Sequence, residues 1–181
     1  DFVKVAGRIP LPPKYTFGYW WCRYWEYSDY ELLDLAKTFK SYSIPVDVMI
    51  IDMDWHETWP ELKDKYKKDE FGQRIGWTGY TWKKELFPNP KNLFIQLHSM
   101  SIKTSLNLHF NNGIQPYEEP YSRFVNDYLS RTSDYDGPKG YIHGDGRAAA
   151  VPFRIDQLEW TDAYFNSVIH PLESDGVDFW W

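Results

Sequence analysis

The feature that most constrains the fold is an alternation between short β-forming runs and longer segments with helical spacing. Residues 46–51 (VDVMII) are mostly apolar and rich in β-formers, as expected of a buried strand in a parallel sheet. Similar runs at residues 14–20, 103–110 and 177–181 predict three more strands. Because helical segments separate these runs, we expect parallel strands joined by right-handed crossovers.

The helical segments have start signals as well as apolar faces. Ser28, with Glu31 three residues on, predicts a capping box. Asn89 followed by Pro90 predicts the start of the next long helix, and a shorter helix is expected over residues 121–129. The expected inward faces of the three long helices are Leu32, Leu35, Ala36 and Phe39, then Leu93, Leu97 and Met100, then Phe165, Val168, Ile169 and Leu172.

Two α/β architectures fit this order, a doubly wound sheet and a (β/α)8 TIM barrel. No glycine-rich phosphate turn follows the first strand, which disfavours dinucleotide binding. The loops after the strands are long, at residues 55–88 and 113–120, which favours a barrel, whose active site is built from loops at the carboxyl ends of its strands. Residues 130–150 are expected to be irregular or an insertion. A barrel needs about 250 residues. Residues 1–181 are therefore expected to form one partial catalytic barrel domain with about the first four βα units, the remainder being absent.

Composition narrows the class of ligand. The net charge of −6 argues against nucleic acid as a partner, and no apolar run reaches the roughly 20 residues of a membrane span. A single cysteine excludes an internal disulfide and a cysteine-based zinc site. Aromatic residues make up 19% of the chain, which suits either stacking on sugars or bulky core packing.

Residues that can carry chemistry follow the predicted strands. In the segment Asp52-Met53-Asp54-Trp55-His56, two carboxylates spaced i, i+2 would point the same way if the strand continued, although they could instead cap a turn. His109 lies at the end of the predicted third strand and is expected at the same mouth. Of the adjacent Trp180 and Trp181, one is expected to pack against the helices and the other to line the mouth.

Four segments in this order resemble glycoside hydrolase family 31, the α-glucosidase and α-xylosidase family. Residues 11–20 (LPPKYTFGYW) and 44–55 (IPVDVMIIDMDW) resemble its first- and second-strand motifs. Residues 87–90 (FPNP) resemble its lead into the next helix, and residues 176–181 (GVDFWW) resemble the strand before its nucleophilic aspartate.

The resemblance implies a retaining hydrolase of α-linked glycosides that acts on an oligosaccharide or glycoside without a cofactor. It implies that Asp52 binds hydroxyls of the sugar in the −1 subsite, with Met53 on the pocket wall and Trp181 lining the subsite. Trp55 and His109 complete the expected substrate-binding set. The nucleophile is expected about two positions past Trp181 and the acid/base aspartate later still, so no catalytic residue is expected within the chain, which by itself should be inactive.

Several alternatives stay open. The polar segment at residues 107–116 and residues 130–150 depart from the family pattern, which leaves α-galactosides and N-acetyl-hexosaminides open beside α-glucosides. One rival is a metal-dependent barrel hydrolase, with the ligands Asp52, Asp54, His56 and His109. Our first expectation is a site without a metal. Another rival is a non-catalytic sugar-binding module. The start at Asp1 without Met predicts a processed or excised N-terminus. A periplasmic or secreted location is compatible with the sequence. The open edges of a partial barrel sheet predict self-association.

Overall fold

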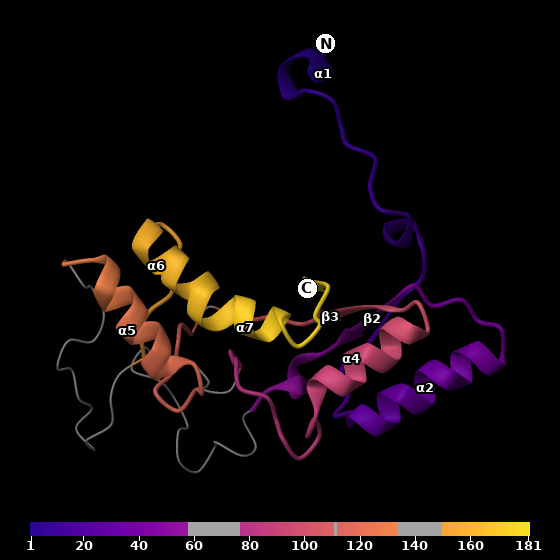
Figure 1. Ribbon diagram of the computed structural model, residues 1–181. Coiled ribbons are helices and arrows are strands. Elements are labelled where there is room, and N and C mark those ends of the chain that lie inside the picture. The colour runs from indigo at the N-terminus through magenta and orange to yellow at the C-terminus, as the bar shows by residue number, and fades with distance from the viewer. Residues whose placement is uncertain (58–76, 111, 134–149) are drawn as a thin grey trace.

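Four short parallel strands form one sheet in the order β1-β2-β3-β4. They are β1 (Trp20–Arg23), β2 (Val48–Ile51), β3 (Lys103–Leu106) and β4 (Phe179–Trp180). The computed structural model describes residues 1–57, 77–110, 112–133 and 150–181 (Figure 1). The predicted alternation of parallel strands and helices is confirmed.

The first strand begins later than predicted. Residues Lys14–Phe17 form a 3-10 turn, in which the amide and hydroxyl of Thr16 both donate to the carbonyl oxygen of Pro13. The indole N–H of Trp20 donates to the carbonyl oxygen of Tyr15 at 3.0 Å. These local bonds hold the aromatic run in a turn, and the strand starts only at Trp20. The prediction of a strand over residues 14–20 is therefore wrong in position.

The first two long helices start where their caps predict. In α2 (Asp29–Ser41), the Ser28 side chain accepts from the amide of Glu31 while the Glu31 carboxylate accepts from the amide of Ser28, which is a complete capping box. In α4 (Pro90–Ser99), the Asn89 side chain accepts from the amide of Asn92 at 3.1 Å. Their apolar residues face the sheet, since Leu32, Ala36, Leu93 and Leu97 are buried in its core.

The last helical segment contains an irregular turn. α6 (Leu158–Tyr164), a π-helical turn (Phe165–Ile169) and α7 (His170–Glu173) follow one another without a break. Pro171 has no amide hydrogen to offer the carbonyl oxygen of Ser167, and Arg123 of α5 (Tyr121–Arg131) donates to that oxygen instead at 2.8 Å. Val168, Ile169 and Leu172 are buried as predicted, but Phe165 is 39% exposed. The π turn changes the helical spacing and explains why Phe165 departs from the predicted face.

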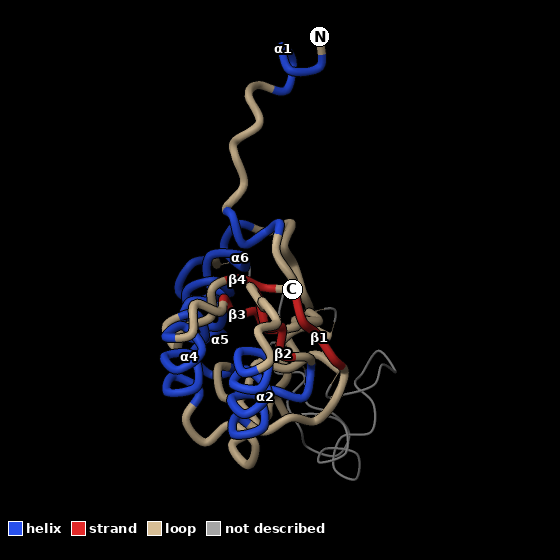
Figure 2. Tube along the Cα trace, turned by 90° about the vertical axis from the view of Figure 1, so that its right-hand side faces the viewer, coloured by secondary structure: helices blue, strands red, loops and turns tan. Residues whose placement is uncertain are grey.

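The two faces of the sheet differ. Met49, Ile51 and Leu106 belong to the core that the sheet forms with the helices, and Figure 2 shows α2, α4 and α5 on the same side of the strands. On the opposite face, here called the inner face, the Trp20 and Phe179 rings of the two outer strands meet at a centroid distance of 5.1 Å. Because β2 and β3 separate these strands, such a contact requires a curved sheet. The fold is part of a (β/α) barrel with helices outside.

The remaining described segment is an N-terminal arm. It carries the short helix α1 (Phe2–Ala6) and extends away from the rest of the chain (Figures 1 and 2). Among the residues that the structure describes, no helix has the length and apolarity needed to span a membrane. Most of the predicted loop segments fall at residues 58–76 and 134–149, which lie outside the described residues.

Candidate functional site at the strand ends

Three neighbouring strands each place a candidate residue directly after their last residue: Asp52 after β2, Asn107 after β3 and Trp181 after β4. The amide of Asn107 donates to the carbonyl oxygen of Ile51 at 2.9 Å, and the amide of Trp181 donates to that of Leu106 at 3.0 Å. These bonds keep the three residues in one row. Because Ile51 and Leu106 face the helices, alternation places the next residue of each strand on the inner face.

Asp52 caps the turn that follows β2. Its Oδ1 accepts from the amide of Met53 at 2.7 Å, at the start of the 3-10 turn Met53–Trp55. Its Oδ2 lies 4.0 Å from the thiol of Cys22, which donates to it, and Asp52 is half-buried. Burial, together with the negative charge of Asp52, raises the pKa of the Cys22 thiol. Since the strand ends at Ile51, the strand alternation that would point Asp52 and Asp54 the same way does not apply. Asp52 caps a turn, which is the alternative that the sequence left open.

Trp55 belongs to the core and has no exposed surface. Its indole N–H donates to the carbonyl oxygen of Asn107 at 2.8 Å, and its ring lies 4.9 Å from that of Trp82. A sugar cannot reach a ring enclosed in this way, so the structure argues against the predicted contact between Trp55 and substrate. Met53, the residue after Asp52, is 5% exposed.

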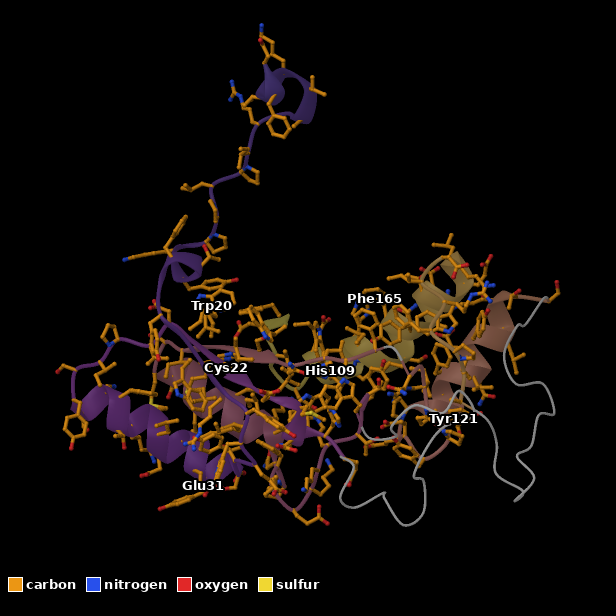
Figure 3. The ribbon with its side chains drawn as sticks, turned by 180° about the vertical axis from the view of Figure 1, so that it is seen from behind. Trp20, Cys22, Glu31, His109, Tyr121 and Phe165 are labelled. Carbon is orange, nitrogen blue, oxygen red and sulfur yellow. The ribbon has the colours of Figure 1, made fainter. Side chains whose placement is uncertain are left out.

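His109 lies on the strand-end side of the sheet. It is half-buried, and its ring lies 4.7 Å from the ring of Trp77, whose plane is inclined by 45°. Its Nδ1 atom is buried and has no hydrogen-bond partner among the described residues. Figure 3 shows His109, Cys22 and Trp20 on the side of the sheet away from Glu31 of α2.

The two adjacent tryptophans take opposite sides, as predicted. Trp180 packs against the helix-side core and donates its indole N–H to Glu173 at 3.0 Å. Trp181 is 60% exposed, with its ring 6.0 Å from that of Trp20 on the inner face. An exposed tryptophan in the same strand-end row as a carboxylate can stack on the apolar face of a sugar while the carboxylate binds its hydroxyls.

The proposed metal ligands do not gather. In the described part of the chain, no group of three or more His, Cys, Asp or Glu side chains could hold an ion. His56 is fully buried, its Nδ1 contacts the carbonyl oxygen of Glu57 at 2.8 Å, and burial lowers its pKa to about 4. His56 is therefore a structural residue of the loop after β2, and the metal-dependent rival finds no support in this geometry.

A second buried acidic group joins two loops at the same end of the sheet. Glu118 is 4% exposed, and its Oε2 accepts from the amide of Tyr80 at 3.2 Å and from the hydroxyl of Thr81. Its Oε1 has no hydrogen-bond partner within the described residues. Burial raises the pKa of Glu118 to about 7.

Sequence reasoning missed Glu118 and Trp77. Glu118 stands beside Glu119 and carries no pattern that distinguishes a buried carboxylate from an exposed one. For Trp77 a signal existed, because the segment Gly76-Trp77-Thr78-Gly79 sets one large ring between two glycines in a loop. Such a ring is a candidate for ligand contact when a core role is not evident.

Comparisons with known proteins agree on a family. Residues 9–181 match the sequence profile of the glycosyl hydrolases family 31 TIM-barrel domain. The chain is 24% identical over 183 residues to an alpha-glucosidase of Saccharolobus solfataricus, covering 99% of this chain and 23% of that protein. It is 27% identical over 107 residues to an alpha-xylosidase of the same organism, covering 59% of this chain and 12% of that protein.

Solved structures share the fold. A GH31 dextranase of Flavobacterium johnsoniae superposes with a TM-score of 0.63 at 21% identity, covering 99% of this chain and 20% of that one. A GH31 alpha-xylosidase from Xanthomonas citri gives a TM-score of 0.62 at 18% identity, over 95% and 17% of the two chains. The present chain thus spans 12% and 23% of the length of the two curated relatives. With the family profile matched from residue 9 to residue 181, the chain belongs to glycosyl hydrolase family 31 and forms part of the TIM-barrel domain of that family.

Proposed function

We propose that this chain supplies the sugar-binding side of a retaining α-glycoside hydrolase. The observation that carries the proposal is the row of Asp52, Asn107 and Trp181 on the inner face, directly after three parallel strands. The carboxyl ends of barrel strands are where active sites of this fold are built. Relatives named alpha-glucosidase and alpha-xylosidase support an α-linked substrate.

In and around this row, four side chains have distinct tasks in our proposal. Asp52 accepts hydrogen bonds from sugar hydroxyls, and these bonds strengthen as the ring distorts in the transition state. Trp181 stacks on an apolar face of the same sugar, Met53 closes the base of the pocket, and His109 lies at its rim. Trp55 has no part because it is enclosed in the core.

The catalytic pair is not in this row. Retaining hydrolysis needs two carboxyl groups about 5–5.5 Å apart, one to attack the anomeric carbon and one to protonate the leaving oxygen. Of the three residues that directly follow β2, β3 and β4, one alone is a carboxylate, and Asp52 is held as the cap of a turn. We therefore place the nucleophile about two residues after Trp181 and the acid/base residue beyond it, as the family resemblance implies.

Sugar binding tests the role of Asp52. Saturation-transfer NMR on the 181-residue chain should detect methyl α-D-glucopyranoside or methyl α-D-xylopyranoside, and Asp52→Asn should abolish the signal. Asparagine keeps an oxygen for the amide of Met53, so the cap survives while the charge is lost. Asp54→Asn is the matched control, with the same change two residues away, and should retain binding. Equal loss in both variants, or no binding of either sugar by the parent chain, contradicts the proposal.

Two further observations separate the hydrolase from its rivals. The chain alone should not hydrolyse nitrophenyl α-glucoside or α-xyloside, and robust turnover would show that the nucleophile lies within the chain. The codons that follow Trp181 in the gene should encode an aspartate about two positions on. The absence of an aspartate at that position favours a sugar-binding module without catalysis.

We also propose that the 181-residue chain self-associates when it is isolated. Among the described strands, β1 pairs with β2 alone and β4 with β3 alone, which leaves two strand edges that can accept another strand. Light scattering after size-exclusion chromatography should show a mass that rises with protein concentration. A constant monomer mass from micromolar to millimolar concentration contradicts this expectation.

A further inference from the structure

The segment from residue 78 to residue 83 is firmly held. Trp82 forms an antiparallel bridge with His56, the amide of Glu57 donates to the carbonyl oxygen of Thr81 at 2.9 Å, and the amide of Lys83 donates to that of Trp55 at 2.9 Å. Residues 81–83 therefore lie beside residues 55–57, which come directly after the strand-end turn. This pairing fixes the segment at the level of the proposed sugar site.

A second set of bonds ties the same segment to the loop after β3. The Thr78 hydroxyl donates to Oδ1 of Asn112 at 3.0 Å and accepts from the Asn112 amide at 3.1 Å. The Tyr80 amide donates to Glu118 at 3.2 Å. Thr78, Tyr80, Asn112 and Glu118 are all buried. Two loops from neighbouring strands are thus joined by interior hydrogen bonds, which cost much to break.

Trp77 stands apart from this buried segment. It is 37% exposed, whereas Thr78 and Tyr80 are 1% and 2% exposed. Its ring is placed against His109, with 4.7 Å between the ring centroids. The exposure of Trp77 is therefore not a sign of a loose segment, because the backbone that follows it is bonded both to residues 55–57 and to the loop after β3. A partly exposed indole on a rigid base is suited to stack against the apolar face of a ligand.

The position of this ring relative to Asp52 suggests which part of a substrate it meets. Asp52 and Asn107 directly follow their strands, whereas His109 lies two residues further along the chain and Trp77 belongs to the loop layer. A sugar held by Asp52 occupies the deeper position in the mouth. The part of the substrate beyond the scissile bond then extends outward, toward the loops.

We propose that Trp77, placed against His109, forms a stacking site for the sugar on the leaving-group side of the scissile bond. This inference rests on the proposed function, because the outward direction is defined by a sugar bound at Asp52. It adds a site for the second sugar of an α-linked disaccharide, and it makes Trp77 a determinant of preference for disaccharides over simple glycosides.

The test compares a monosaccharide with a disaccharide on the same protein. Dissociation constants are measured by NMR titration of the 181-residue chain with methyl α-D-glucopyranoside against isomaltose, and with methyl α-D-xylopyranoside against isoprimeverose. Trp77→Ala should weaken disaccharide binding about tenfold and leave the methyl glycoside unchanged, whereas Trp77→Phe should retain most of the affinity. The matched control is Trp25→Ala, an exposed tryptophan after β1 whose ring is covered by the Arg23 guanidinium at 4.7 Å.

Each outcome distinguishes the inference from the function on which it rests. Unchanged disaccharide affinity in Trp77→Ala, with binding still lost in Asp52→Asn, overturns the stacking site alone. If Trp77→Ala weakens binding of the disaccharide and of the methyl glycoside equally, Trp77 supports His109 and the stacking site is overturned. The stacking site is also overturned if Trp25→Ala weakens disaccharide binding as much as Trp77→Ala does. No binding of any sugar by the parent chain overturns the proposed function as well. In the parent, the indole N–H resonance of Trp77 should shift with the disaccharide and not with the methyl glycoside, a readout that needs no variant.

Discussion

The buried carboxyl group of Glu118 should make the stability of this chain fall as pH rises. Glu118 is 4% exposed and joins the loops after β2 and β3 through Tyr80 and Thr81. Burial raises its pKa from 4.5 to about 7 in the folded chain, because few groups are present to stabilise the charged form. Between pH 4.5 and about pH 7, the folded chain therefore keeps a proton on Glu118, and the unfolded chain releases it.

The sign and size of the effect follow from this difference. A carboxyl group whose folded pKa is raised contributes most stability below pH 4.5, and this contribution is lost as pH rises through about 7. The difference between 4.5 and about 7, at about 1.36 kcal/mol per pKa unit, gives a loss of about 3 kcal/mol. This is a large share of the ~5–15 kcal/mol that holds a typical domain together.

Replacing Glu118 with glutamine removes the titration and keeps an oxygen that can accept from Tyr80 and Thr81. Urea unfolding followed by tryptophan fluorescence should show that Glu118→Gln gains about 2.5 kcal/mol relative to the parent between pH 5 and pH 8, because part of the loss has already occurred at pH 5. The cost of burying the glutamine amide does not change with pH, so it cancels when the relative stabilities at the two pH values are subtracted. Glu119→Gln removes the same charge from an exposed neighbour and controls for net charge. A change in relative stability of less than about 1 kcal/mol between the two pH values would refute the reasoning.

Three smaller predictions concern the packing around the site. His56→Gln should remove a loss of about 2.5 kcal/mol that the parent shows as pH falls from 7 to 4.5, since burial keeps His56 neutral with a pKa of about 4 while the unfolded chain takes up a proton. Urea unfolding at these two pH values measures it. Gly79→Ala should destabilise the fold by about 1–3 kcal/mol in chemical denaturation, because a Cβ there would lie 2.1 Å from Nδ1 of His56, and the cost should shrink in a His56→Ala background. Arg123→Ala should cost about 1–2 kcal/mol in the same assay by leaving the carbonyl oxygen of Ser167 without its donor, and an unchanged midpoint would contradict that.

The parts of the fold that could be predicted from sequence depend on neighbouring residues. The capping box of Ser28 and Glu31 and the start of α4 at Asn89-Pro90 are complete within a few positions, and both are confirmed. The alternation of parallel strands and helices also follows from local pattern. The choice of a barrel over a doubly wound sheet rested on the long loops and on the missing glycine-rich turn. The resemblance to family 31 rested on four such segments, and the family is now shown over residues 9–181.

The expectations that the structure did not meet depended on how far a local pattern continues. The Asp52 and Asp54 pair required β2 to extend past Ile51, but the Asp52 carboxylate accepts from the amide of Met53 and starts a turn. Phe165 was expected on the inward face because regular helical spacing was assumed. Pro171 and the π turn alter that spacing, and the acceptor left by Pro171 finds its donor on α5, 44 positions earlier in the sequence.

The aromatic excess shows why composition alone could not locate the site. A tryptophan can be buried when its indole N–H finds an acceptor, and here the acceptors are remote in sequence: Trp55 donates to Asn107, 52 positions away, and Trp82 to Asp175, 93 positions away. Both rings are thereby assigned to the core. Trp181 and Trp77 are 60% and 37% exposed at the strand ends, where a ligand can reach them. Long-range acceptors thus place Trp55 and Trp82 in the core, which local sequence could not indicate. Trp55 beside Asp52 was therefore the misleading choice, and Trp77 was the one missed.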